Sequence, residues 1–394
     1  MAEKKRLLVL ASTYPRWQDD PEPGFVYELS KRLTDAFEVT VLCPHAAGAK
    51  TRERMDGVDV RRYRYASASL ETLVNNGGIN GNLKKSPWKW LLVPGFLLSQ
   101  WWHTLWLIRR LKPDVVHSHW IIPQGLVLCM ARLFTARVPF VLTSHGADLF
   151  TLKGGLMAGL KAKILSRAAF VTVVSEPMRQ QALRLGVPED RVAVMPMGVD
   201  FEKFTPSADV ARNPNEILFV GRLVEKKGLS YLIRALERVR HEIPDVRLTV
   251  IGFGPEEPAL RKLSADLDLD RHVDFIGPKP HSELISHYRR AALFVAPFVE
   301  AADGDQEGLG LVTIEAIACG CKVLVGDVAA VKDLPIMTVH SRNTDAFAKT
   351  LSATLRASSS EIGKADSHQL FLSMFSWIHV TARYERVLSQ WRAG

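Results

Sequence analysis

Residues 219–228 read Phe-Val-Gly-Arg-Leu-Val-Glu-Lys-Lys-Gly, and they contain the end of a strand, a loop and the start of a helix. An apolar strand predicted near Ile217 to Val220 ends at Gly221, and the loop that follows carries Arg222 and Lys227. Apolar residues then recur at helical spacing. Strand, loop and helix in this order form the repeating unit of a parallel sheet whose two faces are covered by helices.

The same alternation continues on both sides of this stretch. Short β-branched runs bounded by turn residues predict strands near residues 7–11, 38–42, 58–63, 115–118, 140–144, 170–174 and 192–196, and then near 217–220, 247–251, 273–276, 293–296 and 323–325. The 394 residues exceed what one compact core usually organises, so two domains are expected. Proline and asparagine interrupt the pattern between Gly198 and Asn215, which places the linker there. The sequence therefore predicts an α/β fold with two doubly wound sheets, which bind ligands at the carboxyl ends of their strands.

Composition and charge narrow the class of protein. Hydrophobic residues make up 47% and charged residues 24%, which excludes a disordered, collagen-like or disulfide-framework chain. The four cysteines, Cys43, Cys129, Cys319 and Cys321, are too scattered for a secreted disulfide pattern, so a reducing compartment is expected. The net charge of +9 is concentrated in residues 1–200, where 27 Lys and Arg stand against 17 Asp and Glu. This half is expected to face an anionic partner, such as a membrane surface, a nucleic acid or a phosphorylated substrate.

Tryptophans and basic residues gather between Lys84 and Lys112, where the alternation of strand and helix stops. An apolar helix flanked by indoles and cations is typical of a segment that lies in the headgroup layer of a membrane. The alternative is a long core helix whose charged ends reach solvent. A membrane-spanning helix is disfavoured, because Pro94, Gly95 and Gln100 interrupt the apolar run. We expect a membrane-facing surface that consists of Trp88, Trp90, Trp101, Trp102, Trp106, Lys84, Lys85 and Lys89.

Two motifs in the second half combine the charges and glycines of an anion-binding site. Arg222 offers a planar fork for phosphate oxygens and Lys227 a point charge, although a solvated basic loop would have the same sequence. Residues 307–315 read Glu-Gly-Leu-Gly-Leu-Val-Thr-Ile-Glu and place two carboxylates before and within a predicted helix. Glycine lets the backbone approach a ligand, and the helix N-terminus favours phosphate. Glu315 lies in an apolar stretch, where an acid normally has a dedicated partner, so a functional role is favoured over a solvated glutamate pair.

These motifs together resemble the retaining glycosyltransferases of family 4, which have the GT-B architecture. The resemblance is carried by Arg222 with Lys227, Glu307 to Glu315, Pro196 to Asp200 and Ala318 to Val323, and its exopolysaccharide and colanic-acid branch by Pro23 to Leu29, His117 to Trp120 and Pro123 to Gly125. It spans essentially the whole chain. It implies two Rossmann-like domains that face a central cleft. Residues 1–200 would bind the acceptor, residues 201–375 would bind a nucleotide-sugar donor, and residues 376–394 would form a helix that returns to the first domain.

The same resemblance implies the site residues. Arg222 and Lys227 would contact the donor diphosphate, Glu307 the hydroxyls of the donor sugar, and His145 the transferred sugar, so these four are the expected catalytic residues. A lone histidine at a strand end could also be a structural hydrogen bonder. The donor is further expected to contact Glu315, Gly308, Leu309, Gly310, Gly221, Gly252 and Gly254. The loop that meets the acceptor or diphosphate is expected to contain Gly24, Phe25, Glu28 and His119.

Two signals could indicate a metal ion. Asp303-Gly304-Asp305 offers two carboxylates that could hold a divalent cation with a diphosphate, but the two basic residues already supply the countercharge. His117 and His119 alternate along a predicted strand, and we expect them to point to opposite faces, where they could not chelate one ion. No metal or other cofactor is therefore expected.

The sequence as a whole predicts a retaining glycosyltransferase that moves a sugar from a nucleotide-diphosphate sugar to a saccharide acceptor linked to polyprenyl diphosphate, in cell-surface polysaccharide synthesis. We expect a cytoplasmic protein that associates peripherally with the inner face of the cell membrane. One alternative is a non-hydrolysing sugar-nucleotide epimerase of the same architecture, which needs no membrane-facing surface. The other is a basic nucleic-acid-binding protein, which the charge alone suggests. The sequence contains no recognisable nucleic-acid motif, so no nucleic-acid partner is expected.

Overall fold

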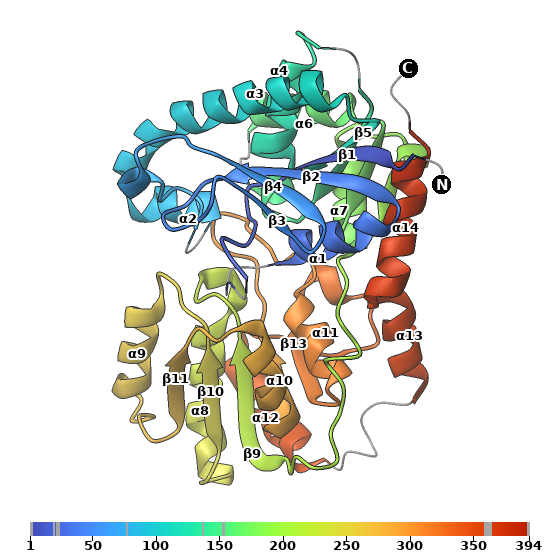
Figure 1. Cartoon of the computed structure of the whole chain (residues 1–394). Helices are drawn as coiled ribbons and strands as arrows, with labels where there is room; N and C mark the ends of the chain where they lie inside the picture. Colours follow the sequence, from blue (N-terminus) through green and yellow to red (C-terminus); the bar gives the residue numbers. More distant parts are fainter. Residues whose placement is uncertain are drawn as a thin grey trace. The chain divides into compact units, whose positions relative to one another are not determined.

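The computed structural model describes residues 3–18, 20, 24–75, 78–135, 138–151, 154–357 and 365–391. The chain forms two compact units, one of Met1–Met197 with Ile378–Gly394 and one of Gly198–Trp377. Each unit contains a largely parallel sheet covered by helices, as Figure 1 shows. The predicted pair of Rossmann-like α/β domains is confirmed.

The sheet of the first unit is built around the earliest strand. β1 (Lys5–Leu10) pairs in parallel with β2 (Phe37–Pro44) on one side and with β5 (Val115–His119) on the other. The described strands lie in the order β3 (Arg52–Met55), β4 (Val58–Tyr63), β2, β1, β5, β6 (Phe140–Ser144), β7 (Phe170–Val173) and β8 (Val192–Val194). β5 and β6 are buried at every position, as a parallel strand covered on both faces must be.

The strand β3 was not predicted, and it makes the first sheet mixed. It pairs antiparallel with β4, with Met55 opposite Val58. Asp56 and Gly57 form the turn between them, with positive φ angles of 41° and 86°. Two positive φ angles are characteristic of the type I′ turn, for which Asp-Gly is a preferred sequence. The dipeptide was a hairpin signal, but the polar composition of β3 concealed the strand before it.

The helices of the first unit cover this sheet. They are α1 (Phe25–Arg32), α2 (Gly78–Lys85), α3 (Leu92–Leu111), α4 (Leu126–Ala131), α5 (Ala147–Phe150), α6 (Gly155–Leu165), α7 (Glu176–Arg184) and, from its second residue on, α14 (Trp377–Ser389). α14 joins this unit although it follows the second unit in sequence: the Tyr384 hydroxyl donates to Met195 O at 3.0 Å, and Lys5 Nζ donates to Ser389 O at 2.6 Å. Figure 1 shows α14 in red along the edge of this unit, with its end beside the start of β1.

The second unit is built on a parallel sheet. The described strands lie in the order β11 (Val273–Gly277), β10 (Arg247–Ile251), β9 (Asn213–Val220), β12 (Ala291–Ala296), β13 (Lys322–Gly326) and β14 (Met337–Val339). The helices are α8 (Leu229–Glu242), α9 (Glu257–Asp266), α10 (His281–Arg290), α11 (Leu311–Ala318), α12 (Thr344–Arg356) and α13 (Ala365–Phe375). Leu232, Ile233 and Leu236 of α8 are fully buried in the core, as their helical spacing predicted. β14 was not predicted, because three residues are too short to show a periodic pattern.

Glycines let two loops at the carboxyl edge of this sheet touch backbone to backbone. A Cβ on Gly252 would lie 1.9 Å from Gly221 O, and a Cβ on Gly254 would lie 2.2 Å from Leu223 O. No side chain fits at such separations, so the loops after β9 and β10 can pack this closely because both positions are glycine. The predicted donor residues Gly252 and Gly254 therefore have a packing role that does not depend on a ligand, and Gly221 provides the carbonyl that Gly252 approaches.

We expect Gly254→Ala to lower the free energy of unfolding by about 1–3 kcal/mol, because the new methyl group collides with the Leu223 backbone. Thermal and urea unfolding followed by circular dichroism measure the change. The matched control is Gly159→Ala in α6, where a Cβ meets nothing within 4 Å and the stability should stay equal or rise. A Gly254→Ala protein as stable as the wild type would contradict the packing role.

Candidate active site

The loop after β9 brings a lysine onto a glutamate of the loop before α11. Lys227 Nζ lies 2.8 Å from Glu307 Oε2, and both side chains are largely buried. Lys227 ends a short 3-10 turn (Glu225–Lys227), and Gly228 follows with a φ of 69°. A Cβ on Gly228 would lie 1.9 Å from Pro297 O, so glycine is required where this turn meets the end of β12. Two of the four predicted catalytic residues thus meet at the carboxyl edge of the sheet.

Burial and pairing set the charges of this ion pair. Burial acts to raise the pKa of Glu307, but the positive charges of Lys227, Lys226 and Arg222 outweigh it and bring the pKa to about 2. Burial lowers the pKa of Lys227, and the Glu307 carboxylate opposes that shift. Lys227 Nζ also lies 4.8 Å from the centroid of the Phe298 ring, which stabilises its charge. Arg222 is exposed, so its guanidinium can meet an anion arriving from solvent beside the fixed ammonium.

A second lysine fastens the loop that carries Glu307. Lys226 Nζ donates to Asp305 Oδ1 at 3.1 Å and to Gln306 O at 3.2 Å, and Asp305 N donates to Asp303 Oδ1 at 2.9 Å. The carboxylates of Asp303 and Asp305 therefore accept hydrogen bonds from the protein itself, which hold this loop in place. In the part of the chain that the structure describes, no three His, Cys, Asp or Glu side chains gather as metal ligands. Lys226 has no distinguishing signal in the sequence, because two adjacent lysines look alike in the motif.

The turn before α11 is shaped by glycine against an aromatic ring. Gly310 has a φ of 75°, and a Cβ there would lie 2.6 Å from the Phe298 ring. Gly308 and Leu309 are buried. These three predicted donor residues thus form a tight turn that ends at the N-terminus of α11, where free backbone N–H groups favour an anion.

Glu315 has partners inside the second unit. Its Oε2 accepts from the Tyr288 hydroxyl at 2.9 Å, and its Oε1 lies 2.8 Å from His281 Nε2. Burial raises the pKa of Tyr288, so that hydroxyl remains a donor. Tyr288 is the dedicated partner expected for an acid in an apolar helix. The His281 side chain is 64% exposed, and it is the partner that a ribose hydroxyl would replace in the predicted role.

In the first unit, the loop after β1 leads into α1 with the predicted acceptor residues. Gly24 precedes the helix, and the Phe25 ring lies 4.8 Å from the His145 ring. Glu28 instead forms ion pairs with Lys31 and Arg32 of its own helix. The Glu28 carboxylate is therefore engaged within α1, whereas Phe25 lies beside the predicted catalytic histidine.

Three histidines meet at the carboxyl edge of the first sheet. His119 ends β5, His145 follows β6, and Nδ1 of His119 lies 2.9 Å from Nε2 of His145. The His117 and His119 rings lie 4.1 Å apart. The expectation that these two point to opposite faces was wrong, because side chains two positions apart in a strand share a face. Burial lowers the pKa of all three, to about 3 for His117 and His145, so the group is neutral at physiological pH.

Asp148 and Trp120, for which no role was predicted, also lie at this edge. Asp148 Oδ1 accepts from Ser144 Oγ at 2.8 Å and Oδ2 accepts from Ile121 N at 2.7 Å, which ties together the loops after β5 and β6. Trp120 has a φ of 73°, rare for a residue with a side chain, and its ring lies 4.9 Å from the His145 ring. Backbone strain of this kind is concentrated at functional sites. The positive φ of Trp120 has no signal in the sequence.

The basic and tryptophan-rich segment forms α2, a 3-10 turn (Pro87–Leu91) and α3. Leu91, Leu98, Trp102 and Trp106 are exposed along one face at helical spacing, and Trp88 and Trp90 are exposed beside its start. Met130, Leu133 and Phe134, at and just after the end of α4, are exposed as well. We call these nine residues the apolar stripe. Among the described residues, no helix combines the length and apolarity needed to cross a bilayer.

Two members of the predicted membrane-facing surface are only partly exposed. The Trp101 side chain of α3 is half-buried and packs edge-on against Phe134, just after α4, with ring centroids 5.7 Å apart. Lys89 Nζ donates to Thr72 O at 2.9 Å and to Asn82 Oδ1 at 3.1 Å. Burial lowers the pKa of Lys89. Lys84 and Lys85 are exposed, as predicted.

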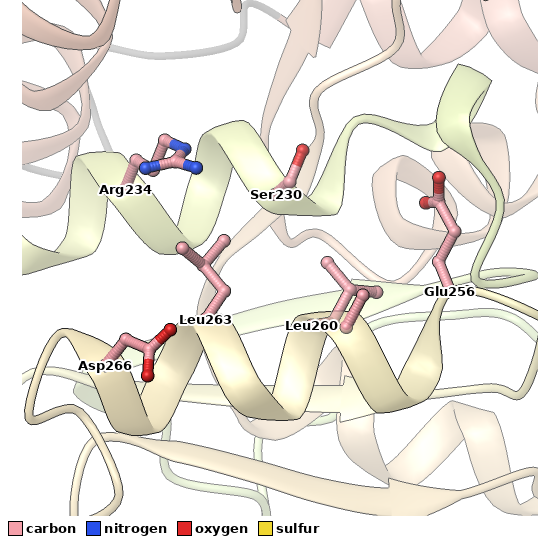
Figure 2. Close-up of a pocket in the computed structure, with 7 residues that line it drawn as sticks. Ser230, Arg234, Glu256, Leu260, Leu263 and Asp266 are labelled. Atoms are coloured by element: carbon pink, nitrogen blue, oxygen red, sulfur yellow. The ribbon is translucent and has the colours of Figure 1, made fainter.

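Two hollows in the second unit contain none of the predicted site residues. One of about 340 Å³ runs between α8 and α9, lined by Ser230 and Arg234 on one side and by Leu260, Leu263 and Asp266 on the other, as Figure 2 shows. The other, of about 570 Å³, lies at the amino ends of β9, β10 and β11. The amino ends form the edge opposite to the one where parallel sheets bind ligands.

Two family models match the chain, one over most of each compact unit. Residues 25–203 match Glycosyltransferase Family 4, and residues 200–359 match Glycosyl transferases group 1. The D-inositol 3-phosphate glycosyltransferase of Mycolicibacterium smegmatis is 30% identical over 318 residues, which cover 71% of this chain and 69% of that protein. The chain belongs to the group 1 glycosyltransferases. The predicted enzyme class is thereby confirmed at this level.

Other relatives of this glycosyltransferase match over shorter regions. The GDP-mannose-dependent alpha-(1-6)-phosphatidylinositol monomannoside mannosyltransferase of M. smegmatis is 32% identical over 52% of this chain and 56% of that protein. The putative colanic acid biosynthesis glycosyltransferase WcaL of Escherichia coli is 34% identical over 41% and 40%. The chain thus spans about half the length of these curated relatives.

Solved structures share the whole fold at low identity. Sucrose-phosphate synthase from Thermosynechococcus elongatus has a TM-score of 0.76 at 18% identity, and Anabaena HepE in complex with UDP and glucose has a TM-score of 0.70 at 14% identity. Each match covers 98% of this chain and 99% of the other. These likenesses show that the two Rossmann-like domains are those of the GT-B glycosyltransferase fold.

We expect Glu307→Gln to weaken the second unit at neutral pH and to remove part of its sensitivity to acid. The pKa of Glu307 is about 2 against an ordinary 4.5, so the ion pair contributes stability above about pH 5 that is lost as the pH falls towards 2. The variant should lose on the order of 2 kcal/mol at pH 7, and its difference from the wild type should shrink below about pH 4.

Urea unfolding at a series of pH values measures this prediction. The matched control is Glu283→Gln, because the Glu283 side chain is 52% exposed and its ion pair with Lys279 should contribute little to stability. A difference between Glu307→Gln and the wild type that stays constant down to about pH 3 would show that the ion pair does not set the acid stability.

Proposed function

We propose that this glycosyltransferase moves a sugar from a nucleotide-diphosphate sugar to a saccharide acceptor in the synthesis of a cell-surface polysaccharide. The observation that carries the proposal is the buried pair of Lys227 and Glu307 beside the exposed Arg222, at the carboxyl edge of a parallel sheet. Arg222 and Lys227 bind the donor diphosphate, and Glu307 binds hydroxyls of the donor sugar. The names of two relatives, one GDP-mannose-dependent and one assigned to colanic acid biosynthesis, support the donor class and the pathway class.

We further propose that transfer retains the anomeric configuration without a covalent intermediate on the protein. As the bond between the sugar and the diphosphate breaks, negative charge grows on the leaving phosphate oxygen, and Arg222 and Lys227 stabilise that charge. The same phosphate oxygen takes the proton of the acceptor hydroxyl, whose oxygen forms the new bond on the face from which the phosphate departs. The arriving diphosphate competes with Glu307 for Lys227, and the freed carboxylate then accepts hydrogen bonds from the sugar. The two basic residues supply the countercharge, so we propose that no metal ion is needed.

The acceptor that we propose is a saccharide on polyprenyl diphosphate, bound while the enzyme lies on the inner face of the membrane as a peripheral protein. The apolar stripe supports this proposal, because large exposed apolar patches mark interaction sites. Arg61 and Arg110 lie 5.6 and 5.3 Å from the Trp106 ring, so cations adjoin the stripe as an anionic lipid surface requires. One relative is named as acting on phosphatidylinositol monomannoside, which is a lipid acceptor.

The direct test incubates the full chain with UDP-, GDP- and ADP-sugars in the presence and absence of polyprenyl-diphosphate saccharides, and determines the anomeric configuration of the product by NMR. Transfer that requires the acceptor and retains the donor configuration is expected. An epimerised or hydrolysed donor that forms without any acceptor would instead favour a sugar-nucleotide epimerase.

We expect Arg222→Gln to fold normally and to lower kcat by about a hundredfold or more, because the exposed guanidinium stabilises the leaving diphosphate. The rise in melting temperature that the preferred nucleotide causes should also be smaller in this variant, since a ligand that binds the native state raises its melting temperature. The matched control is Arg234→Gln on α8, also exposed, which should retain wild-type turnover. Equal turnover in both variants would remove Arg222 from the donor site.

We expect Trp102→Ala to weaken binding to vesicles that contain phosphatidylglycerol by on the order of tenfold, because the 60% exposed indole lies in the middle of the apolar stripe. Co-sedimentation with vesicles, with and without the anionic lipid, measures the loss. Ile378→Ala in α14 is the control, since Ile378 is 74% exposed but lies outside the stripe. If the wild-type protein stays in the supernatant when such vesicles sediment, that result would contradict the peripheral membrane proposal.

A further inference from the structure

One hydrogen bond joins two buried imidazole rings at the carboxyl edge of the first sheet, and its direction decides what His145 offers a ligand. Nδ1 of His119 lies 2.9 Å from Nε2 of His145, and the two rings are nearly parallel. His119 is fully buried, whereas His145 is partly exposed. Both are neutral, because burial lowers their pKa values. Each ring therefore carries one N–H, and one of the two protons lies in the shared bond.

Two arrangements satisfy the shared bond. If His145 donates from Nε2, His119 must carry its own proton on Nε2, which is buried and has no hydrogen-bond partner among the described residues. If His119 donates from Nδ1, its Nε2 is a bare lone pair, and His145 must carry its proton on Nδ1. Orphaned buried N–H groups are rarer in proteins than under-satisfied acceptors, so the second arrangement is favoured.

The neighbouring His117 follows the same rule. The Tyr384 hydroxyl donates to Met195 O at 3.0 Å, so it accepts from Thr172 Oγ1 at 3.4 Å. Thr143 Oγ1 then donates to Thr172 at 2.6 Å, and Nε2 of His117 donates to Thr143 at 2.7 Å. This chain leaves Nδ1 of His117 as a bare lone pair, and that atom has no partner within the described residues. Every buried donor of the group is thereby used.

We propose that His119 is a positioning residue that fixes His145 in the Nδ1–H tautomer, so that His145 meets its ligand as a neutral hydrogen-bond donor to an oxygen of the bound saccharide. The functional part rests on the proposed glycosyl transfer. The tautomer itself does not, because it follows from the protein alone. In this role His145 is neither a general base nor a cation, and Asp148 keeps its turn in place by accepting from His145 N at 3.3 Å.

The tautomer is measured by ¹⁵N NMR on the full chain with labelled histidine, in which the pattern of couplings between ring nitrogens and ring protons shows which nitrogen is protonated. The His145 signals are identified by their loss in His145→Gln. We expect Nδ1–H at His145 in the wild type. His119→Phe keeps a ring but removes the donor and should shift His145 towards Nε2–H, whereas His119→Asn keeps a donor near the Nδ1 position and should restore Nδ1–H. A wild-type His145 protonated on Nε2, or a tautomer unchanged in folded His119→Phe, would overturn the proposal.

Activity supplies the second measurement. We expect His119→Phe to lower kcat by about threefold to tenfold and His119→Asn to recover most of it, because one neutral hydrogen bond is at stake. The matched control is His117→Phe, which removes a buried imidazole that does not bond to His145, and it should leave the His145 tautomer unchanged. If transfer itself is not found, the proposed function fails while the NMR assignment stands. If transfer is found and His145 carries Nε2–H, the inference fails alone.

Discussion

A salt bridge in surroundings of low polarity, between Lys227 and Glu307, constrains the carboxyl edge of the second sheet. Neither charge is tolerable there alone, so the turn after β9 and the loop before α11 must meet at one point. The packing around the pair holds the two loops together. Gly228 leaves room for Pro297 O, and Gly310 leaves room for the Phe298 ring. Lys226 binds the loop before α11 through Asp305. In the proposed function, this pre-organisation means that little reorganisation is needed when the donor diphosphate replaces the carboxylate at the lysine.

The corresponding edge of the first sheet has the opposite electrostatic character. Its three histidines, His117, His119 and His145, are buried enough to stay neutral. The hydrogen bonds that start at His117 run in one direction, through Thr143, Thr172 and Tyr384, to the carbonyl of Met195. A charged edge suits a diphosphate, which brings its own negative charge. An edge lined by neutral imidazoles suits sugar hydroxyls, which need oriented donors and acceptors rather than countercharge. The two units thus present different chemistry on the same kind of sheet edge.

Repeating patterns were predictable from the sequence, while features set by local backbone geometry were not. All of the predicted strands occur among the described ones, because buried parallel strands read as short apolar runs. β3 was not predicted because most of its residues are polar, although the Asp56-Gly57 dipeptide is a preferred sequence for a hairpin turn. The Arg222, Lys227 and Glu307 group followed from a motif. Three features of the two sites depend on how the folded chain is arranged. They are the positive φ of Trp120, the hydrogen bonds of Asp148 and the hydrogen bonds by which Lys226 holds the loop before α11. No local spacing encodes such features.

The helix α3 shows why composition predicted an exposed apolar surface but not which residues form it. Its buried face carries Leu92 and Phe96 but also Gln100 and Thr104, while Leu98, Trp102 and Trp106 face outward. A helix that meets only protein and water would place the polar pair outside and the indoles inside. The side-chain polar atoms of Gln100 and Thr104 have no hydrogen-bond partner within the described residues, so their burial stabilises the fold little. This arrangement is the one that the proposed membrane contact requires, because it leaves the indoles outside. The helical phase decides that Trp102 lies on the outward face and that Trp101 packs against Phe134.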